Sequence, residues 1–369
     1  MQVCPTCKRQ FVERLRACPA DGTALRELAA PIRDPLQQRV LEGRYRLEGK
    51  VGEGGMGLVY RATRLQDGAT VAIKILVERS GARANEDRKR FQREAQLLSQ
   101  LNHPNLVALL DAGQADGGLL YLVMEYLEGR TLHEVVPDAG TGAEAAAAIM
   151  EEVCAALGAA HKAGVVHRDL KPENVFIARQ RDGSHVVKVI DFGLAKAMET
   201  DESSRLTMTG KVVGSAGFIA PEHILGSREF TPASDIYALG GILFYMLTGH
   251  RPYAGESVAQ VMEAQVKEKP PALGLPAGHE ALVLEYTVRR AMSRKPEKRF
   301  SSTRDMQVSL QHAMKVLQRR RTPTLTLNGM TVVRRALTSG TQARKQVLAA
   351  GAGVLVGLAA LGAFWLLSQ

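Results

Sequence analysis

Acidic residues are missing from the last part of this 369-residue chain, since no Asp or Glu follows Asp305. The same stretch holds eight Lys and Arg residues, which account for most of the net charge of +10. They are Lys315, Arg319, Arg320, Arg321, Arg334, Arg335, Arg344 and Lys345. Aromatic residues are not interleaved with these charges, and this argues against a nucleic-acid surface. The basic tail instead predicts contact with the anionic surface of a membrane.

We also expect no secretory signal peptide, because the N-terminus has no continuous apolar run. We therefore expect a reducing compartment, where clustered cysteines are more often metal ligands than disulfides. Cys4 and Cys7 form a CxxC knuckle. Cys18 begins a second turn, which has Asp21 where a zinc ribbon has its last cysteine. Carboxylate oxygen also binds zinc, so residues 1–28 are predicted to be a zinc-ribbon-like segment with these four ligands. The alternative is a disordered lead-in without a metal.

The run His167-Arg-Asp-Leu-Lys-Pro-Glu-Asn174 places a carboxylate, a cation and an amide in one short loop. Asp169 could orient a hydroxyl, Lys171 could bind phosphate and Asn174 could bind a metal, a combination that suits phosphoryl transfer. Alone, the run could equally be a charged surface loop.

Two further markers follow in order, Asp191-Phe-Gly193 and Ala220-Pro-Glu222. In this order and spacing the three motifs resemble those of the eukaryotic-type (Hanks-type) serine/threonine protein kinases found in bacteria. Lys295-Pro-Glu-Lys-Arg299 resembles the motif whose arginine pairs with the glutamate of Ala-Pro-Glu, here Glu222.

Upstream, short strands are predicted over 44–51, 58–64 and 70–76, and a glycine-rich loop follows the first of them. Its GxGxxG spacing is a weak signal alone, because dinucleotide-binding turns share it. Here the loop joins two strands and does not open a helix, and Lys74 follows in the third strand. Both features favour the kinase interpretation.

The resemblance implies an α+β, bilobal protein-kinase fold. Its N-lobe is an antiparallel sheet with helix C, and its C-lobe is mainly helical. The kinase domain is expected over 45–312, after a linker at 29–44. A basic, Thr-rich juxtamembrane segment at 313–346 follows it.

The resemblance also implies roles for single residues. Lys74 holds the α- and β-phosphates of ATP and pairs with Glu94 of the helix predicted over 83–101; without Lys74, Glu94 would count as an ordinary surface glutamate. Asn174 and Asp191 hold Mg²⁺ or Mn²⁺. Asp169 orients the acceptor hydroxyl, and Lys171 steadies the γ-phosphate. The residues implied around ATP are Gly52, Glu53, Gly54, Gly57, Val59, Ala72, Lys74, Glu125, Leu127, Phe176 and Asp191.

Lys171 marks the serine/threonine form of the catalytic loop. Arg168, which precedes the catalytic aspartate, is typical of kinases that are switched on by phosphorylation of the activation loop. Thr207 and Thr209 match the paired threonines of bacterial receptor-type kinases and are predicted autophosphorylation sites. Ser215 stands in the part of that loop that receives the substrate, where it could contact Asp169.

Residues 347–367 are uncharged and almost wholly apolar, and as a helix these 21 residues could cross a membrane. The alternative is a buried helix of the fold. Arg344 and Lys345 just before it predict a single-pass protein of the inner membrane with the kinase domain in the cytoplasm. Gly353 and Gly357 suggest that two such helices could pack as a homodimer.

Two rival functions share many of these motifs. A pseudokinase scaffold would have lost at least one of Lys74, Asp169, Asn174 and Asp191, and the sequence keeps all four. A kinase of small molecules would lack the Ala-Pro-Glu segment. We therefore expect a serine/threonine kinase that acts on proteins in membrane-associated signalling.

Overall fold

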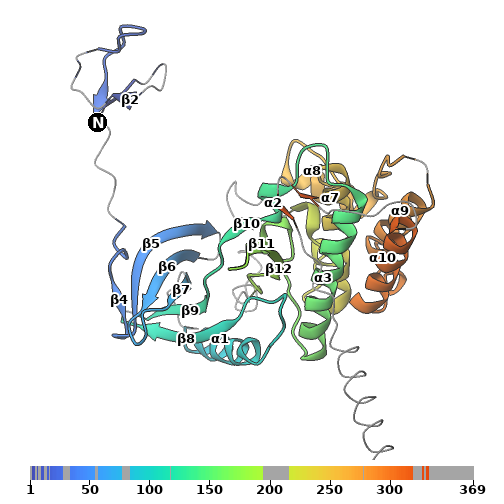
Figure 1. Ribbon diagram of the computed structural model, residues 1–369, viewed down its shortest axis with the longest axis horizontal. Coiled ribbons are helices and arrows are strands. Elements are labelled where there is room, and N and C mark those ends of the chain that lie inside the picture. The colour runs from blue at the N-terminus through green and yellow to red at the C-terminus, as the bar shows by residue number, and fades with distance from the viewer. Residues whose placement is uncertain are drawn as a thin grey trace, which may run out of the picture.

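The computed structural model describes residues 34–54, 57–76, 84–116, 118–193, 216–276 and 278–318. It also describes parts of the segment between residues 2 and 27, and two short strands between 326 and 331. The main body has two lobes, a sheet of strands with one helix and a larger helical lobe (Figure 1). The expected bilobal α+β architecture is confirmed.

A six-stranded antiparallel sheet forms the N-lobe, in the order β4-β5-β6-β7-β9-β8. Side chains of a strand point alternately to its two faces, and on β6 this buries Tyr60 and Ala62. The strands are β4 (Val40–Leu41), β5 (Tyr45–Gly54), β6 (Gly57–Arg64), β7 (Thr70–Leu76), β8 (Leu109–Ala115) and β9 (Leu119–Glu125).

Residues 34–41, expected to be part of a linker, pack against this sheet. β4 pairs with β5, and Leu41 is fully buried in the core of the lobe. Asp34 accepts a hydrogen bond of 2.6 Å from the hydroxyl of Tyr60. The sequence did not reveal this strand, because the alternation of apolar and polar residues is visible only over four or more residues.

Helix α1 (Ala84–Ser99) covers the other side of the sheet, where Figure 1 shows it beside β8. Phe91 and Ala95 are buried, and Leu98 packs partly against the same cluster. Their spacing of four and three residues places them on one face of the helix. This face contacts Leu76 and residues of β9, so the position of α1 depends on a small apolar contact with the sheet.

Helix α7 (Pro232–Thr248) runs through the centre of the C-lobe and is buried almost throughout. Its sequence is apolar on all sides, as a helix enclosed by other helices requires. It ends at Gly249, where φ is +76° and a Cβ atom would lie 2.1 Å from the carbonyl oxygen of Asp138. Only glycine fits such a close left-handed position.

Other helices and strands surround α7. The longer helices are α3 (Ala143–Lys162), α8 (Val258–Lys267), α9 (His279–Ala291) and α10 (Thr303–Gln318). The short ones are α2 (Leu132–Val135), α6 (Pro221–Ile224), η1 (Pro172–Asn174), η3 (Ala216–Phe218) and η4 (Pro296–Lys298). A small sheet joins β10 (Gly129–Thr131), β11 (Val175–Arg179) and β12 (His185–Val189).

Two small sheets are formed by residues that come before and after the two lobes in the sequence. β1 (Gln2–Val3) is the middle strand between β2 (Gln10–Phe11) and β3 (Arg26–Glu27). β13 (Thr326–Leu327) pairs with β14 (Met330–Thr331). Among the helices that the structure describes, none has the length and apolarity to cross a membrane. The predicted span at 347–367 is outside the described residues.

Candidate active site

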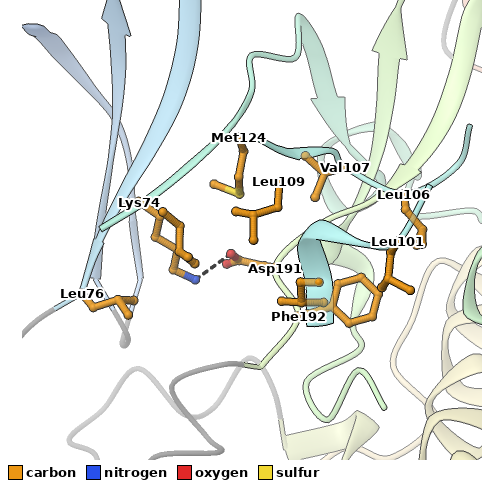
Figure 2. A pocket seen from close by; sticks show the side chains of 11 residues that line it. Lys74, Leu76, Leu101, Leu106, Val107, Leu109, Met124, Asp191 and Phe192 are labelled. Atoms are coloured by element: carbon orange, nitrogen blue, oxygen red, sulfur yellow. Dashed lines mark hydrogen bonds and ion pairs between the residues drawn. The ribbon is translucent and has the colours of Figure 1, made fainter. Parts of the chain in front are cut away.

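An ion pair between Lys74 and Asp191 marks the centre of the site, where β7 faces the loop after β12 (Figure 2). Lys74 is buried on β7, and its Nζ lies 2.6 Å from Oδ1 of Asp191. Asp191 has a φ of +62°, a conformation that non-glycine residues keep mainly where function requires it. The structure therefore brings together the lysine predicted to hold phosphates and the aspartate predicted to hold a metal.

Asp169, Lys171 and Asn174 form a second cluster on the loop before β11. Nζ of Lys171 lies 3.0 Å from Oδ2 of Asp169. The side-chain amide of Asn174 donates to the carbonyl oxygen of Asp169 at 2.8 Å. Proline at the start of η1 restricts the backbone of this turn. The cation and the amide that the sequence predicted to act with the carboxylate both contact Asp169.

The two clusters are neighbours through the backbone. The amide of Ile190 donates to the carbonyl of Asn174 at 3.0 Å, which places Asn174 beside the residue that precedes Asp191. Because Asn174 uses its side-chain nitrogen within the loop, its side-chain oxygen is the atom that a metal would take. A carboxylate and an amide oxygen are hard ligands that suit Mg²⁺ or Mn²⁺.

Asp235 of α7 fixes the backbone of the loop that carries Asp169, and its side chain is almost completely buried. Its Oδ2 accepts from the backbone amide of His167 at 2.9 Å, and its Oδ1 accepts from that of Arg168 at 3.2 Å. Nε2 of His161 lies 2.7 Å from Oδ2. The contact of His161 could not be predicted from the sequence, because it appears only when α3 and α7 pack.

The His167 ring links the catalytic loop to the residue that precedes Asp191. Burial lowers the pKa of His167, although the carboxylate of Asp235 opposes the shift, so the ring is neutral near pH 7. Its Nε2 donates to the carbonyl of Ile190 at 3.0 Å, and its Nδ1 accepts from the amide of Asp169 at 3.3 Å. The neutral ring thus joins the backbone on both sides of the site.

The predicted pair of Lys74 and Glu94 is not formed in this structure. Glu94 of α1 binds Arg168 instead, with Nη1 2.8 Å from Oε1 and 3.0 Å from Oε2. Lys74 has Asp191 as its ion-pair partner. The sequence could not show which of the two cations Glu94 reaches, because that depends on where α1 lies.

The glycine-rich segment forms the hairpin between β5 and β6. Gly52 pairs with Val59, and Gly54 with Gly57; residues 55 and 56 are outside the description. Gly57 has a φ of +155°, and a Cβ atom there would lie 2.1 Å from the carbonyl oxygen of Ile75. Here β6 lies too close to β7 for any side chain. Glu53 forms an exposed ion pair with Lys50.

Glu125 and Leu127, two of the residues that the resemblance implies around ATP, lie at the end of β9 and just after it. The amide of Glu125 donates to the carbonyl of Ala108 at 3.0 Å, so an adenine contact at Glu125 must use its carbonyl. The Glu125 side chain forms an ion pair of 2.6 Å with Lys188, and Ala72 pairs with Met124 across the sheet. Leu127 follows β9, and Phe176 is on β11 opposite Thr131.

A pocket between α1, the sheet and Asp191 extends this site, and the sequence did not predict it. It is mostly apolar, and Lys74 and Asp191 supply its charges (Figure 2). Its other lining residues are Leu76, Leu98, Leu101, Leu106, Val107, Leu109, Leu122, Met124 and Phe192. These apolar residues come from many elements, so the sequence around each one looks the same as for a residue of the hydrophobic core. The sequence therefore cannot show that they line a pocket.

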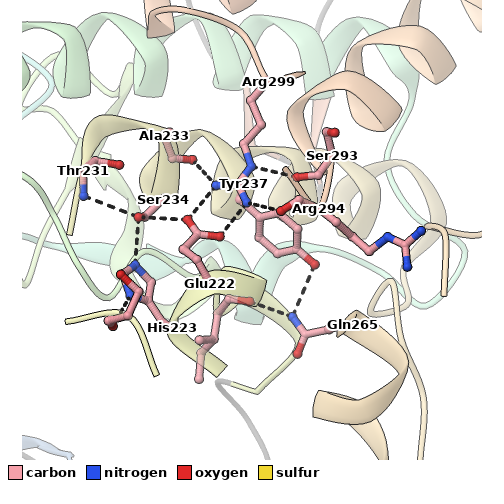
Figure 3. Close-up of polar contacts among 12 residues, drawn as sticks. Glu222, His223, Thr231, Ala233, Ser234, Tyr237, Gln265, Ser293, Arg294 and Arg299 are labelled. Atoms are coloured by element: carbon pink, nitrogen blue, oxygen red, sulfur yellow. Dashed lines mark hydrogen bonds and ion pairs between the residues drawn. The ribbon is translucent and has the colours of Figure 1, made fainter. Parts of the chain in front are cut away.

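The expected pair of Glu222 and Arg299 is present deep in the C-lobe (Figure 3). Nη1 of Arg299 lies 2.8 Å from Oε1 of Glu222, and Nη2 lies 2.6 Å from Oε2. Burial would raise the pKa of Glu222, but the guanidinium of Arg299 holds it below its usual value. Arg299 also donates to the carbonyl of Ala233, so it joins α6 to α7.

Some predicted site residues are outside the described part of the chain: Thr207, Thr209, Ser215 and Cys7. In the N-terminal segment, Sγ of Cys4 lies 3.4 and 3.3 Å from the two carboxylate oxygens of Asp21. Cys18 joins them, and one ligand atom of each of the three residues lies within 4.8 Å of the others.

Comparison with known proteins agrees with this geometry. A family model described as "Protein kinase domain" matches residues 45–314. The chain is 37% identical over 290 residues to the serine/threonine-protein kinase pkn3 of Myxococcus xanthus, covering 77% of this chain and 52% of that protein. It is 37% identical over 276 residues to the serine/threonine-protein kinase PknB of Mycobacterium tuberculosis, covering 73% and 43%. The chain thus spans about half the length of the curated relatives it matches.

Solved structures give the same result for the fold. The kinase domain of Mycobacterium tuberculosis PknI, as a C20A_R136A double mutant, has a TM-score of 0.58 and 25% identity. The match covers 75% of this chain and 98% of that one. A structure of Rad53 residues 1–466 in complex with AMP-PNP has a TM-score of 0.57 and 26% identity, covering 73% and 64%.

Proposed function

Because the chain belongs to the protein kinase domain family, we propose that it is a serine/threonine protein kinase that transfers the γ-phosphate of ATP to hydroxyl groups of proteins. The observation that carries this proposal is the adjacency of two clusters, Lys74 with Asp191 and Asp169 with Lys171 and Asn174. Phosphoryl transfer needs positioning and charge neutralisation more than covalent chemistry, and these side chains supply both.

Each residue then has a defined task. Lys74 draws the α- and β-phosphates into the cleft under the glycine-rich hairpin. Asn174 and Asp191 hold Mg²⁺, which offsets the negative charge of the phosphates. Asp169 accepts a hydrogen bond from the acceptor hydroxyl and orients it toward the γ-phosphate. Lys171, already 3.0 Å from Asp169, neutralises charge on the transferred group.

Regulation is proposed to act through Arg168. A phosphate on Thr207 or Thr209 would bring a charge of about −2 and several acceptor oxygens for a guanidinium. We expect autophosphorylation there, in trans between two copies of the chain. The basic tail and the apolar residues 347–367 support a single-span anchor in the inner membrane, with the kinase domain in the cytoplasm. Gly353 and Gly357 could pair such spans in a homodimer.

Transfer of labelled phosphate from Mg-ATP to a generic basic protein tests the activity. We expect labelling by the wild type and loss of at least about a hundredfold in Asp169→Asn, because the base and its hydrogen bond are removed. Asp116→Asn is a matched control, since Asp116 is exposed and away from the cleft. A wild-type protein that binds ATP and never transfers phosphate would be a scaffold, and the proposal would be wrong.

A further inference from the structure

We infer that Cys4, Cys18 and Asp21 are ligands of one zinc ion, and that this ion holds the N-terminal segment together independently of the kinase domain. The inference does not depend on the proposed phosphoryl transfer. In this site Asp21 takes the ligand position that a cysteine usually holds. Cys7 lies outside the described residues and stays a ligand predicted from the sequence.

The distances match a tetrahedral ion. With Zn–S of about 2.3 Å and Zn–O of about 2.1 Å, the sulfur and oxygen ligands of one zinc lie about 3.6 Å apart, and two sulfurs about 3.8 Å apart. Sγ of Cys4 lies 3.4 and 3.3 Å from the oxygens of Asp21. A ligand atom of Cys18 is within 4.8 Å of both partners. Cys4 and Asp21 are therefore within a few tenths of an ångström of the tetrahedral spacing, and Cys18 is within roughly 1 Å of it.

The backbone holds the second turn in a shape that presents both of its ligands. The amide of Gly22 donates to the carbonyl of Cys18 at 2.9 Å, and the amide of Cys18 donates to the carbonyl of Thr23 at 2.8 Å. Gly22 has a φ of +69°, which glycine adopts without strain. The amide of Thr23 donates to Oδ1 of Asp21 at 3.0 Å and orients the carboxylate. Cys4 comes directly after β1, the middle strand of the small sheet.

The segment has little else to stabilise it. Its strands are two residues long. Among the described side chains of residues 1–27, the buried ones are those of Cys4 and Cys18. Burying two thiols against a carboxylate gains little apolar free energy, whereas a bound zinc contributes its binding energy directly to folding. A mixed sulfur and oxygen ligand set also fits zinc better than the hard cations of the kinase site.

Metal analysis of the full chain, purified in detergent under reducing conditions, tests the inference. We expect about one zinc per chain, and after exchange to Co²⁺ the absorption bands of a tetrahedral thiolate site. Cys18→Ser and Asp21→Ala should each lower zinc affinity at least about tenfold. Asp21→Cys should bind zinc more tightly than the wild type, and Cys154→Ala, in α3 of the C-lobe, should keep wild-type zinc.

Three results would overturn the inference. One is a wild-type chain that takes up neither Zn²⁺ nor Co²⁺. Another is a disulfide between Cys4 and Cys18 in cells. The third is wild-type zinc affinity in Asp21→Ala, which would remove Asp21 from the site. Thermal unfolding of the kinase domain, measured on each variant, separates loss of metal from general misfolding, and phosphoryl transfer is not needed as a readout.

Discussion

Arg168 binds Glu94 through Nη1, at 2.8 Å from Oε1 and 3.0 Å from Oε2. Arg168 belongs to the loop that carries Asp169, and Glu94 to helix α1 of the other lobe. In this structure the Glu94 carboxylate binds Arg168 while Lys74 binds Asp191, and a guanidinium held by Glu94 is less available to a phosphate. The position of α1 therefore depends on whether Arg168 binds Glu94 or another anion.

Glu94→Gln should lower kcat/KM for phosphoryl transfer about tenfold to a hundredfold. The reason is that a charge-assisted hydrogen bond to Lys74, worth about 1.5–3 kcal/mol, would be lost in the active arrangement. Steady-state kinetics on the phosphorylated enzyme measure this. Gln92→Ala, on the exposed side of α1, is the control. Unchanged kinetics in Glu94→Gln would mean that Glu94 acts only with Arg168.

Arg168→Gln should make activity independent of activation-loop phosphorylation. The substituted side chain can no longer exchange Glu94 for a phosphate, so phosphatase treatment should leave its rate unchanged while lowering that of the wild type. Rates before and after treatment, with phosphate content checked by mass spectrometry, give the comparison. An equal loss in both proteins would contradict a role of Arg168 in the switch.

Arg299→Met should destabilise the C-lobe by about 3–5 kcal/mol, because breaking a buried pair leaves Glu222 charged without its guanidinium. The Arg299 side chain is 0% exposed and that of Glu222 is 18% exposed. Urea unfolding measures the change, and Arg228→Met, on an exposed residue, is the control.

Glu222→Gln tests the same pair through pH. The folded protein lowers the pKa of Glu222 below its ordinary value of 4.5. The stability that this shift contributes is therefore fully present above 4.5 and is lost as the pH falls through the folded pKa. The wild type should exceed Glu222→Gln in unfolding free energy at neutral pH, and the difference should shrink below pH 4.5. A difference that stayed constant with pH would exclude the charge of Glu222 as its cause.

Gly57→Ala should destabilise the N-lobe by about 2 kcal/mol or more and raise the KM for ATP. The added Cβ would lie 2.1 Å from the carbonyl oxygen of Ile75, so β6 and β7 would have to separate beside Lys74. Gly49→Ala, with open space around its Cβ, is the matched control. Thermal unfolding and ATP titration measure the two effects, and equal values for both variants would contradict the clash.

The sequence predicted the site well where one short motif carries the geometry. Asp169, Lys171 and Asn174 are close in the chain, so local backbone structure alone brings them together. Lys74 and Asp191 are far apart in the chain, and the motifs of the family indicated both as ATP-site residues but paired Lys74 with Glu94, so their ion pair was not predicted. The partner of Glu94 could not be predicted, since it depends on how α1 packs on the sheet.

Other misses have similar physical causes. Residues 34–41 are too short to show a strand period, so their place on the sheet was missed. His161 lies in an Ala-rich helix, and its contact with Asp235 requires the packing of two distant helices.

The strand at Val40–Leu41 also bears on where this domain can be cut. A fragment that starts at Tyr45 would leave the hydroxyls of Tyr60 and Tyr121 without Asp34 and Glu42, which accept their hydrogen bonds. Both phenol rings are fully buried, and each orphaned hydroxyl would cost about 1–3 kcal/mol. Soluble fragments for crystallisation should therefore begin before Asp34, even though the kinase motifs start later.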